Sequence, residues 1–235
     1  HQTKIALVIG NNNYTNIPPL KNSINDAELI TKTLKKINFE TIIHKDVKSH
    51  KEFRDILKSF YKQAKEYDIK LIYYAGHAIE EESQNYLVPI DYKSDDDKEC
   101  FSEGNWDGGL YPIKDIINYN RKMEDGANIL ILDACREPCP SRSISNEGGL
   151  ARVNPPKGSF FAYSTEYGKK AFDGNNNNSV YTEILARHLK KPNVTITDMF
   201  QNIRTEMNHI TDNQVPVEEN KLTEHIILNI NTKNK

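Results

Sequence analysis

Residues 129–139 have the sequence "ILILDACREPC", in which four apolar residues are followed by a carboxylate, a small residue, a thiol and a guanidinium. A short apolar run of this kind is typical of a strand buried on both faces of a sheet. It therefore predicts a central strand that carries Asp133 and Cys135 to its carboxyl end. Because side chains alternate along a strand, we expect these two residues to share one face.

Further strands alternate with amphipathic helices along the chain. Apolar runs predict strands at residues 4–9, 40–46, 69–77, 128–135 and 158–165. Helical spacing of apolar residues predicts three helices, built around Ala27, Ile30, Leu34 and Ile37, around Phe53, Ile56, Leu57 and Phe60, and around Ile113, Ile116 and Ile117. This alternation favours an α/β fold, in which a mostly parallel sheet is covered by helices on both faces and ligands bind at the carboxyl ends of its strands.

Local signals predict where some of these elements begin and end. The Gly/Asn-rich sequence "GNNNY" (10–14) suits a turn with positive φ angles, and Ser23 or Asn25 can cap the helix that follows. We expect the strand at 69–77 to break at its glycine. A last strand is expected at "EHIILNI" (224–230).

Composition limits the class of protein. The chain has 235 residues, 37% of them hydrophobic, which suffices for one domain over residues 1–235 with a sizeable core. A net charge of −2 gives no strong field for nucleic acid or an anionic membrane, and no apolar run is long enough to span a bilayer. An odd number of cysteines, three, favours a reducing compartment, so the cytoplasm is the expected location.

Three polar segments, residues 93–99, 136–149 and 174–179, are predicted to be poorly ordered or mobile loops. The acidic segment 93–99 is most simply a solvated loop, and a divalent-ion site is the minority interpretation because its carboxylates lack a recognisable ligand spacing.

Two of the predicted strands end in a side chain that can do chemistry, His77 and Cys135. If the strands are parallel neighbours, imidazole and thiol meet at one edge of the sheet. A free thiol has a pKa of about 8.5, and a nearby imidazolium favours the reactive thiolate. Such a pair is sufficient for acyl transfer, with the backbone N–H groups near Ala78 and of Cys135 as candidate oxyanion donors.

Other interpretations of these residues stay open. A lone cysteine or histidine is more often structural, and Cys135 with Cys139 can form a disulfide or a metal pair, although a single C-x3-C is a weak metal signal. A phosphatase loop would need an arginine where Ser141 stands. A nucleotide-binding sheet is disfavoured because "GNNNY" has neither G-x-G-x-x-G nor a P-loop lysine.

The chain carries six blocks, in this order and over nearly its whole length: "KIALVIGNNNY", "LKNSINDAELI", "LIYYAGHA", "NYLVPID", "ILILDACR" and "GLARVNPPKGSFFAYSTEYGKKAFDG". Together they resemble the caspase-like cysteine peptidases, and among them the paracaspases and their bacterial caspase-domain relatives. The resemblance implies a three-layer αβα sandwich with His77 and Cys135 as the catalytic dyad. It departs at Ala78, where the family has glycine.

The resemblance also implies a specificity. Paracaspases and metacaspases cleave after Arg or Lys and bind that side chain with carboxylates, which match Asp26 in "NDAE", Asp133 in "DAC" and Asp173 in "AFDG". Carboxylates accept hydrogen bonds well from the planar fork of an arginine. The plainer alternatives are a helix-dipole role for Asp26 and turn-forming roles for Asp133 and Asp173.

The same resemblance bears on partners. It implies protein or peptide substrates with a basic residue at the cleavage site. It also implies that the reaction uses no metal or organic cofactor and is independent of calcium. The loop 136–152 contains Arg142 and Arg152, both candidates for self-cleavage. Caspase-like folds often pair through a terminal edge strand, for which residues 224–230 are the candidate in a homodimer. The alternative to an active peptidase is an inactive caspase-like scaffold that acts by binding.

Overall fold

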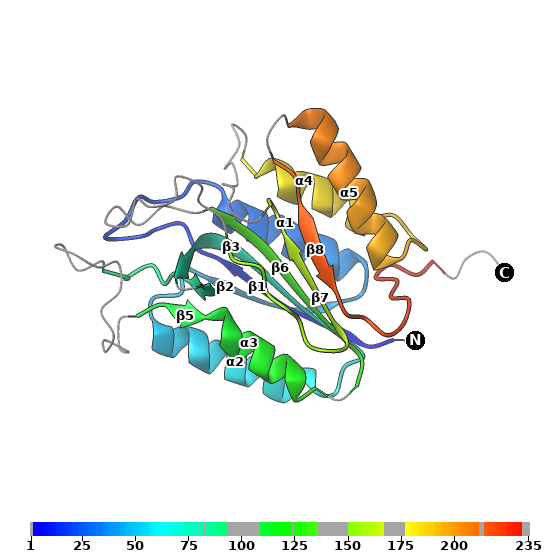
Figure 1. Ribbon diagram of the computed structural model, residues 1–235, viewed down its shortest axis with the longest axis horizontal. Helices are drawn as coiled ribbons and strands as arrows, with labels where there is room; N and C mark the ends of the chain where they lie inside the picture. Colours follow the sequence, from blue (N-terminus) through cyan, green and yellow to red (C-terminus); the bar gives the residue numbers. More distant parts are fainter. Residues whose placement is uncertain are drawn as a thin grey trace.

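The structure is a computed structural model that describes residues 2–81, 83–93, 109–123, 125–135, 150–166, 177–211 and 214–231. Its eight-stranded sheet lies between two layers of helices (Figure 1). One face is covered by α1 (Ser23–Lys36), α4 (Val180–Leu189) and α5 (Ile196–Ile210), and the other by α2 (His50–Ala64) and α3 (Ile113–Arg121). The αβα sandwich expected from the sequence is confirmed.

Six strands form one row in the order β2-β1-β3-β6-β7-β8. Within this row, β2, β1, β3, β6 and β7 run parallel to one another, and β8 is antiparallel to β7 at the edge. The short strands β4 and β5 extend from the end of β3. The bounds are β1 (Lys4–Gly10), β2 (Glu40–Lys45), β3 (Ile69–Glu81), β4 (Gln84–Leu87), β5 (Tyr111–Pro112), β6 (Ala127–Cys135), β7 (Ser159–Tyr163) and β8 (Val217–Asn220).

The sequence predicts that strand β3 breaks at its glycine, and this prediction is wrong. It pairs with β6 up to His77 and with β4 from Ala78 onward, so the strand continues while its neighbours change. Gly76 serves a close approach instead of a turn, because a Cβ atom there would lie 2.5 Å from the hydroxyl of Tyr74 and 2.8 Å from that of Tyr14. His77 therefore lies at a junction of two ladders and not at a strand end.

The "GNNNY" turn also differs from its prediction. No residue of the described stretch 10–14 has a positive φ angle. The side chain of Asn12 instead accepts the backbone N–H of Ile24 (3.0 Å) in the first turn of α1. This helix is therefore capped from the preceding turn, and not by Ser23 or Asn25.

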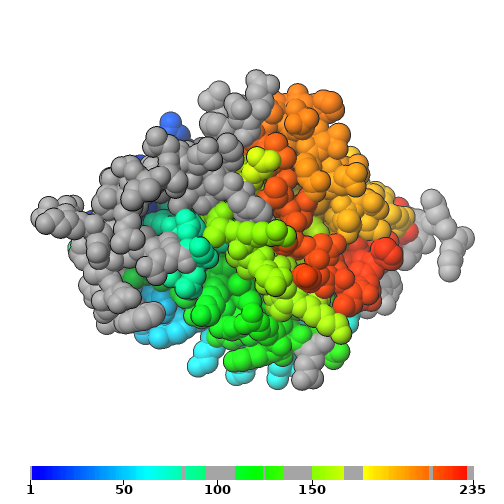
Figure 2. Space-filling model, in the orientation of Figure 1, coloured from blue at the N-terminus to red at the C-terminus, as the bar shows by residue number. Residues whose placement is uncertain are grey.

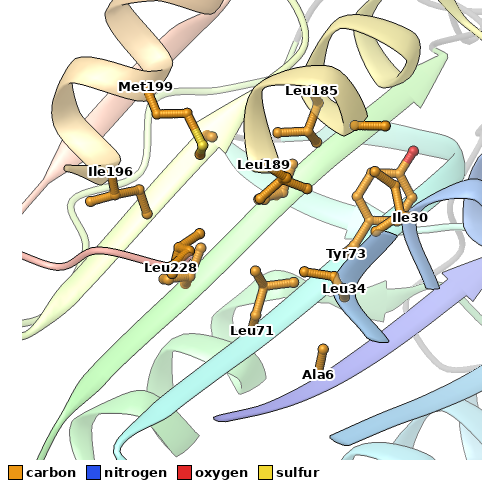
Figure 3. Packing of buried hydrophobic residues seen from close by; sticks show 14 of the residues in the cluster. Ala6, Ile30, Leu34, Leu71, Tyr73, Leu185, Leu189, Ile196, Met199 and Leu228 are labelled. Atoms are coloured by element: carbon orange, nitrogen blue, oxygen red, sulfur yellow. The ribbon is translucent and has the colours of Figure 1, made fainter. Parts of the chain in front are cut away.

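Residues 224–230 do not form the predicted strand, and the edge of the sheet belongs to β8. Ile226 and Leu228 are buried in the apolar cluster under α4 and α5, where Figure 3 places Leu228 with Ile196 and Leu71. The backbone carbonyl of Leu228 accepts a hydrogen bond from Nζ of Lys4 (2.8 Å). The apolar residues of this segment that predict a strand pack instead beneath the two helices.

Helices α4 and α5 lie where the sequence analysis predicted no helix. Each begins at a capping hydroxyl: Ser179 Oγ accepts the N–H of Thr182 (3.1 Å), and Thr195 Oγ1 accepts that of Asp198 (3.1 Å). Together with α1 they bury the largest apolar cluster of the fold (Figure 3). Within the described ranges, no helix combines the length and the apolar character needed to cross a bilayer.

Candidate active site

The histidine and the cysteine expected as a dyad lie side by side on neighbouring strands. Strands β3 and β6 are parallel, and their ladder ends with His77 opposite Cys135. Neighbouring strands in a sheet are about 4.8 Å apart, so the two backbones are adjacent although they are distant in sequence. The backbone of Cys135 is described, whereas the position of its thiol lies outside the described part of the chain.

Two tyrosines hold the backbone of His77. The hydroxyl of Tyr14 accepts the His77 N–H (2.7 Å), and its ring packs on the imidazole with centroids 4.5 Å apart. The hydroxyl of Tyr74 donates to the His77 carbonyl (2.6 Å). Because both hydroxyls crowd Gly76, this position has no room for a side chain.

The imidazole of His77 has a defined tautomer. Its Nε2 lies 2.8 Å from the carbonyl oxygen of Pro18. A carbonyl oxygen only accepts, so Nε2 carries the proton, and Nδ1 is the basic nitrogen of the neutral ring. The side chain is 1% exposed, which protects this hydrogen bond from competition with water. The ring is thereby prepared to take a proton at Nδ1.

Asparagines after β1 anchor the loop that makes these contacts. The buried side chain of Asn11 accepts the Val47 N–H (2.9 Å). The carboxylate of Asp46 accepts the backbone N–H groups of Asn12 (2.9 Å) and Asn13 (3.0 Å). Burial alone would raise the pKa of Asp46, but the hydrogen bonds from Asn13 and Asn12 outweigh it and hold that pKa below its usual value. The loop is thus tied to the end of β2 by an ionised group.

The methyl group of Ala78 packs into the protein interior. It is fully buried in the apolar cluster beneath α2 and α3, opposite Leu87 of β4. The Val88 N–H donates to the His77 carbonyl (3.1 Å), which makes Ala78 and Leu87 a non-hydrogen-bonded pair of the ladder. The N–H of Ala78 therefore points away from β4, on the side of β6.

The two described carboxylates of the expected specificity pocket meet at the N-terminus of α4. Asp26 Oδ1 accepts the N–H of Ser179 (2.9 Å) and Nδ2 of Asn178 (2.8 Å). Asp133 Oδ2 accepts hydroxyl protons from Ser179 (2.5 Å) and Thr182 (2.7 Å). Both aspartates are buried. Hydrogen bonds to the charged form, together with the helix N-terminus, favour ionised carboxylates here.

The pKa values of two neighbouring tyrosines are raised, in part by the negative charge of this pair. Burial, followed by the charges of Asp133 and Asp26, raises the pKa of Tyr73 well above its usual value. Burial and then Asp133 do the same to the pKa of Tyr181. Both phenols therefore stay neutral at physiological pH.

Of the two self-cleavage candidates, Arg152 lies within the described residues. Its guanidinium donates to both carboxylate oxygens of Glu219 on β8 (2.6 and 3.3 Å). Figure 2 shows the residues after 150, in yellow-green, against the red-orange β8. Asp173, Arg142, Cys100, Cys139 and the loops 94–99 and 136–149 lie outside the described residues. Within the part described, no three His, Cys, Asp or Glu side chains gather to hold a metal ion.

Sequence reasoning missed the residues that support the site. Tyr14 and Pro18, which hold His77, carry no signal of their own in the sequence. Ser179 and Thr182, which hold the aspartates, follow the asparagine run "NNNN" and form an S-x-x-T capping pattern that marks a helix start.

Comparison with known proteins agrees with this geometry. The family model described as Caspase domain matches residues 3–227. The human protein named Mucosa-associated lymphoid tissue lymphoma translocation protein 1 is 29% identical over 138 residues, which cover 57% of this chain and 15% of that protein. Its mouse homolog is 28% identical over the same length, again 15% of the relative. The resemblance suggested by the sequence blocks is confirmed.

Proposed function

Because the chain belongs to the caspase domain family, we propose that it is a cysteine endopeptidase that cleaves after Arg, or Lys, with His77 and Cys135 as its dyad. One observation carries the proposal, the register of β3 and β6, which sets these two residues opposite each other. The Nε2-protonated imidazole supports it, because Nδ1 is then ready to receive the thiol proton.

The proposed reaction has two steps. The Cys135 thiolate, formed by proton transfer to Nδ1 of His77, attacks the carbonyl carbon of the substrate, and the imidazolium then gives its proton to the leaving amine. In the second step the neutral imidazole takes a proton from water, which hydrolyses the thioester and releases the acid and the thiol. The N–H groups of Ala78 and Cys135 are the proposed donors to the oxyanion of each tetrahedral intermediate.

The proposed specificity rests on the buried pair Asp26 and Asp133. Two carboxylates at one site attract a guanidinium or an ammonium and repel an acidic side chain. Asp173 is proposed as a third acceptor by resemblance. No metal or organic cofactor takes part in this reaction, so activity is expected to be independent of calcium.

Initial rates on matched fluorogenic peptides that end in Arg, Lys or Asp, with and without chelator, test this function. We expect the kcat/KM for the Arg peptide to exceed that for the Asp peptide by about 30-fold or more, because mispairing a buried charge costs about 2 kcal/mol or more. The chelator is expected to leave the rate unchanged. Preference for Asp, or loss of the rate on chelation, contradicts the proposal.

The alternative function is an inactive scaffold, suggested by alanine in place of the family's glycine after the histidine. The buried methyl group of Ala78 argues against it. An arginine-directed electrophile separates the two, because a peptidase is expected to be labelled at Cys135 and a scaffold is not.

We expect self-cleavage in the loop 136–152 at Arg142 in preference to Arg152, because Glu219 holds the guanidinium of Arg152. Mass spectrometry of purified wild type should find a chain end after Arg142, while Cys135→Ala protein stays intact. The same fragments in both proteins would show that another protease cuts the loop.

The proposed homodimer pairs through β8, the strand at one edge of the sheet. The proposed location is the cytoplasm, on the basis of the cysteine content.

A further inference from the structure

We propose that Thr182 and Tyr73 are positioning residues that fix the Asp133 carboxylate for binding the basic side chain of the substrate. The inference deepens the proposed function and rests on it. Its structural basis is a chain of two hydroxyl groups that leads to the Asp133 carboxylate on β6. Tyr73 on β3 and Thr182 on α4 provide these hydroxyls.

The hydrogen bonds in this chain run in one direction. Thr182 Oγ1 lies 2.7 Å from Asp133 Oδ2 and 2.5 Å from the hydroxyl of Tyr73. An ionised carboxylate only accepts, so the single proton of Thr182 is donated to Asp133. Tyr73 must then donate to Thr182. Its hydroxyl is 3.5 Å from Asp133 Oδ2, too far for a strong direct bond, so it acts on the carboxylate through the threonine.

The chain is rigid because its members are buried in three packed elements. Tyr73 on β3 and Thr182 on α4 are both fully buried, and Asp133 is 5% exposed on β6. Figure 3 shows the ring of Tyr73 beside Ile30 and Leu34 in the apolar cluster, where close packing restricts its movement. Buried hydroxyls are costly to leave unpaired, so Thr182 stays hydrogen-bonded to the carboxylate and Tyr73 to Thr182.

The orientation of a carboxylate decides how well it accepts from a planar guanidinium. With Oδ2 held by Ser179 and Thr182, the plane of the Asp133 carboxylate is fixed, and so is the direction in which it meets a ligand. Among the described residues, the titratable groups near it include Asp26 from α1, Tyr73 from β3 and Tyr181 from α4. Loss of the hydroxyl chain is therefore expected to weaken binding of the basic residue more than the chemical step.

The test compares Thr182→Val, which keeps the shape and removes the hydroxyl, with Thr182→Ser, which restores it, and adds Tyr73→Phe. On the Arg peptide we expect KM to rise about tenfold in Thr182→Val, with kcat within about twofold, because the variant loses a hydrogen bond to a charged group. Tyr73→Phe is expected to show a smaller rise, and Thr182→Ser is expected to return KM to near the wild-type value. The acid limb of the KM profile should move to higher pH in Thr182→Val, since fewer donors then favour the ionised carboxylate.

Thr31→Val is the matched control, because the buried hydroxyl of Thr31 on α1 has no hydrogen-bond partner within the described residues. It loses a hydroxyl without contact to Asp133, so KM is expected to stay unchanged. Unchanged KM in folded Thr182→Val and Tyr73→Phe, or failure of Thr182→Ser to restore it, overturns the inference.

Failure of the proposed function has a different signature. Calorimetric titration of Cys135→Ala protein with the Arg and Asp peptides measures binding without turnover. If this protein does not prefer the Arg peptide, the proposed specificity is wrong and the inference falls with it. If it prefers the Arg peptide and adding Thr182→Val leaves Kd unchanged, the specificity stands and only the role of the hydroxyl chain is overturned.

Discussion

Cys135→Ala and His77→Ala proteins are each expected to fold and to have no measurable peptidase activity. Without the thiol no thioester forms, and a loss of about 10⁴-fold or more in kcat is expected when a nucleophile is removed. Without the imidazole the thiol keeps its proton near neutral pH and the leaving amine receives none, which costs roughly 10²–10⁴-fold for the acid-base step alone. Initial rates on the Arg peptide at matched protein concentration measure both losses.

Matched controls separate the dyad from general effects of removing a thiol or an imidazole. Cys139→Ala and His44→Ala remove the same chemical groups at residues that are not assigned to the dyad, and His44 is half-buried on β2. Both are expected to retain wild-type rates within about twofold. Rates of iodoacetamide labelling should also fall in His77→Ala, because the thiolate population falls. Wild-type activity in Cys135→Ala, or equal losses in Cys139→Ala, would refute the assigned dyad.

Asp133→Asn is expected to lower kcat/KM for Arg peptides by about 10²–10³-fold, and Asp26→Asn to have an effect of the same kind. Truncating one partner of a buried, hydrogen-bonded charge pair costs about 2–5 kcal/mol, since the other charge is left buried and unpaired. Asparagine keeps the size of aspartate, and its amide oxygen can still accept from Thr182. The change therefore removes charge with little change of packing.

Two readouts show whether this loss concerns specificity. The rate of iodoacetamide labelling at Cys135 is expected to stay near the wild-type value, because the dyad is intact while the pocket has changed. Asp55→Asn is the control for a carboxylate elsewhere, as Asp55 is exposed and paired with Lys51 on α2. Its kcat/KM should match that of wild type. Full activity on Arg peptides in Asp133→Asn would exclude this residue from the pocket.

The sheet and the edge that carries the site were predictable because their signals are local. Runs such as residues 129–132 are apolar on both faces, and residues that follow parallel strands in such a sheet share one edge. The register that sets His77 opposite Cys135 is not local, since it depends on pairing between distant segments. The resemblance to a family supplied that pairing before the structure did.

The supports of the site could not be predicted because each acts through space. Asn12 caps α1 from the previous turn, and Pro18 sets the tautomer of His77 with a backbone carbonyl that any residue possesses. Gly76 lies inside a continuous strand because neighbouring hydroxyls leave no room for a side chain, whereas glycine in a sequence usually indicates a break. Residues 224–230 contain an apolar run like that of a strand, yet this run packs beneath helices α4 and α5.

The change of partners along β3 has a consequence for how the site tolerates variation. Hydrogen-bonded ladders shift only by whole residues, so substitutions that leave the ladder intact keep His77 and Cys135 in register. Substitutions around the site thus tune its rate or its preference. An insertion or deletion within the paired part of β3 or β6 would shift this register and uncouple the two residues.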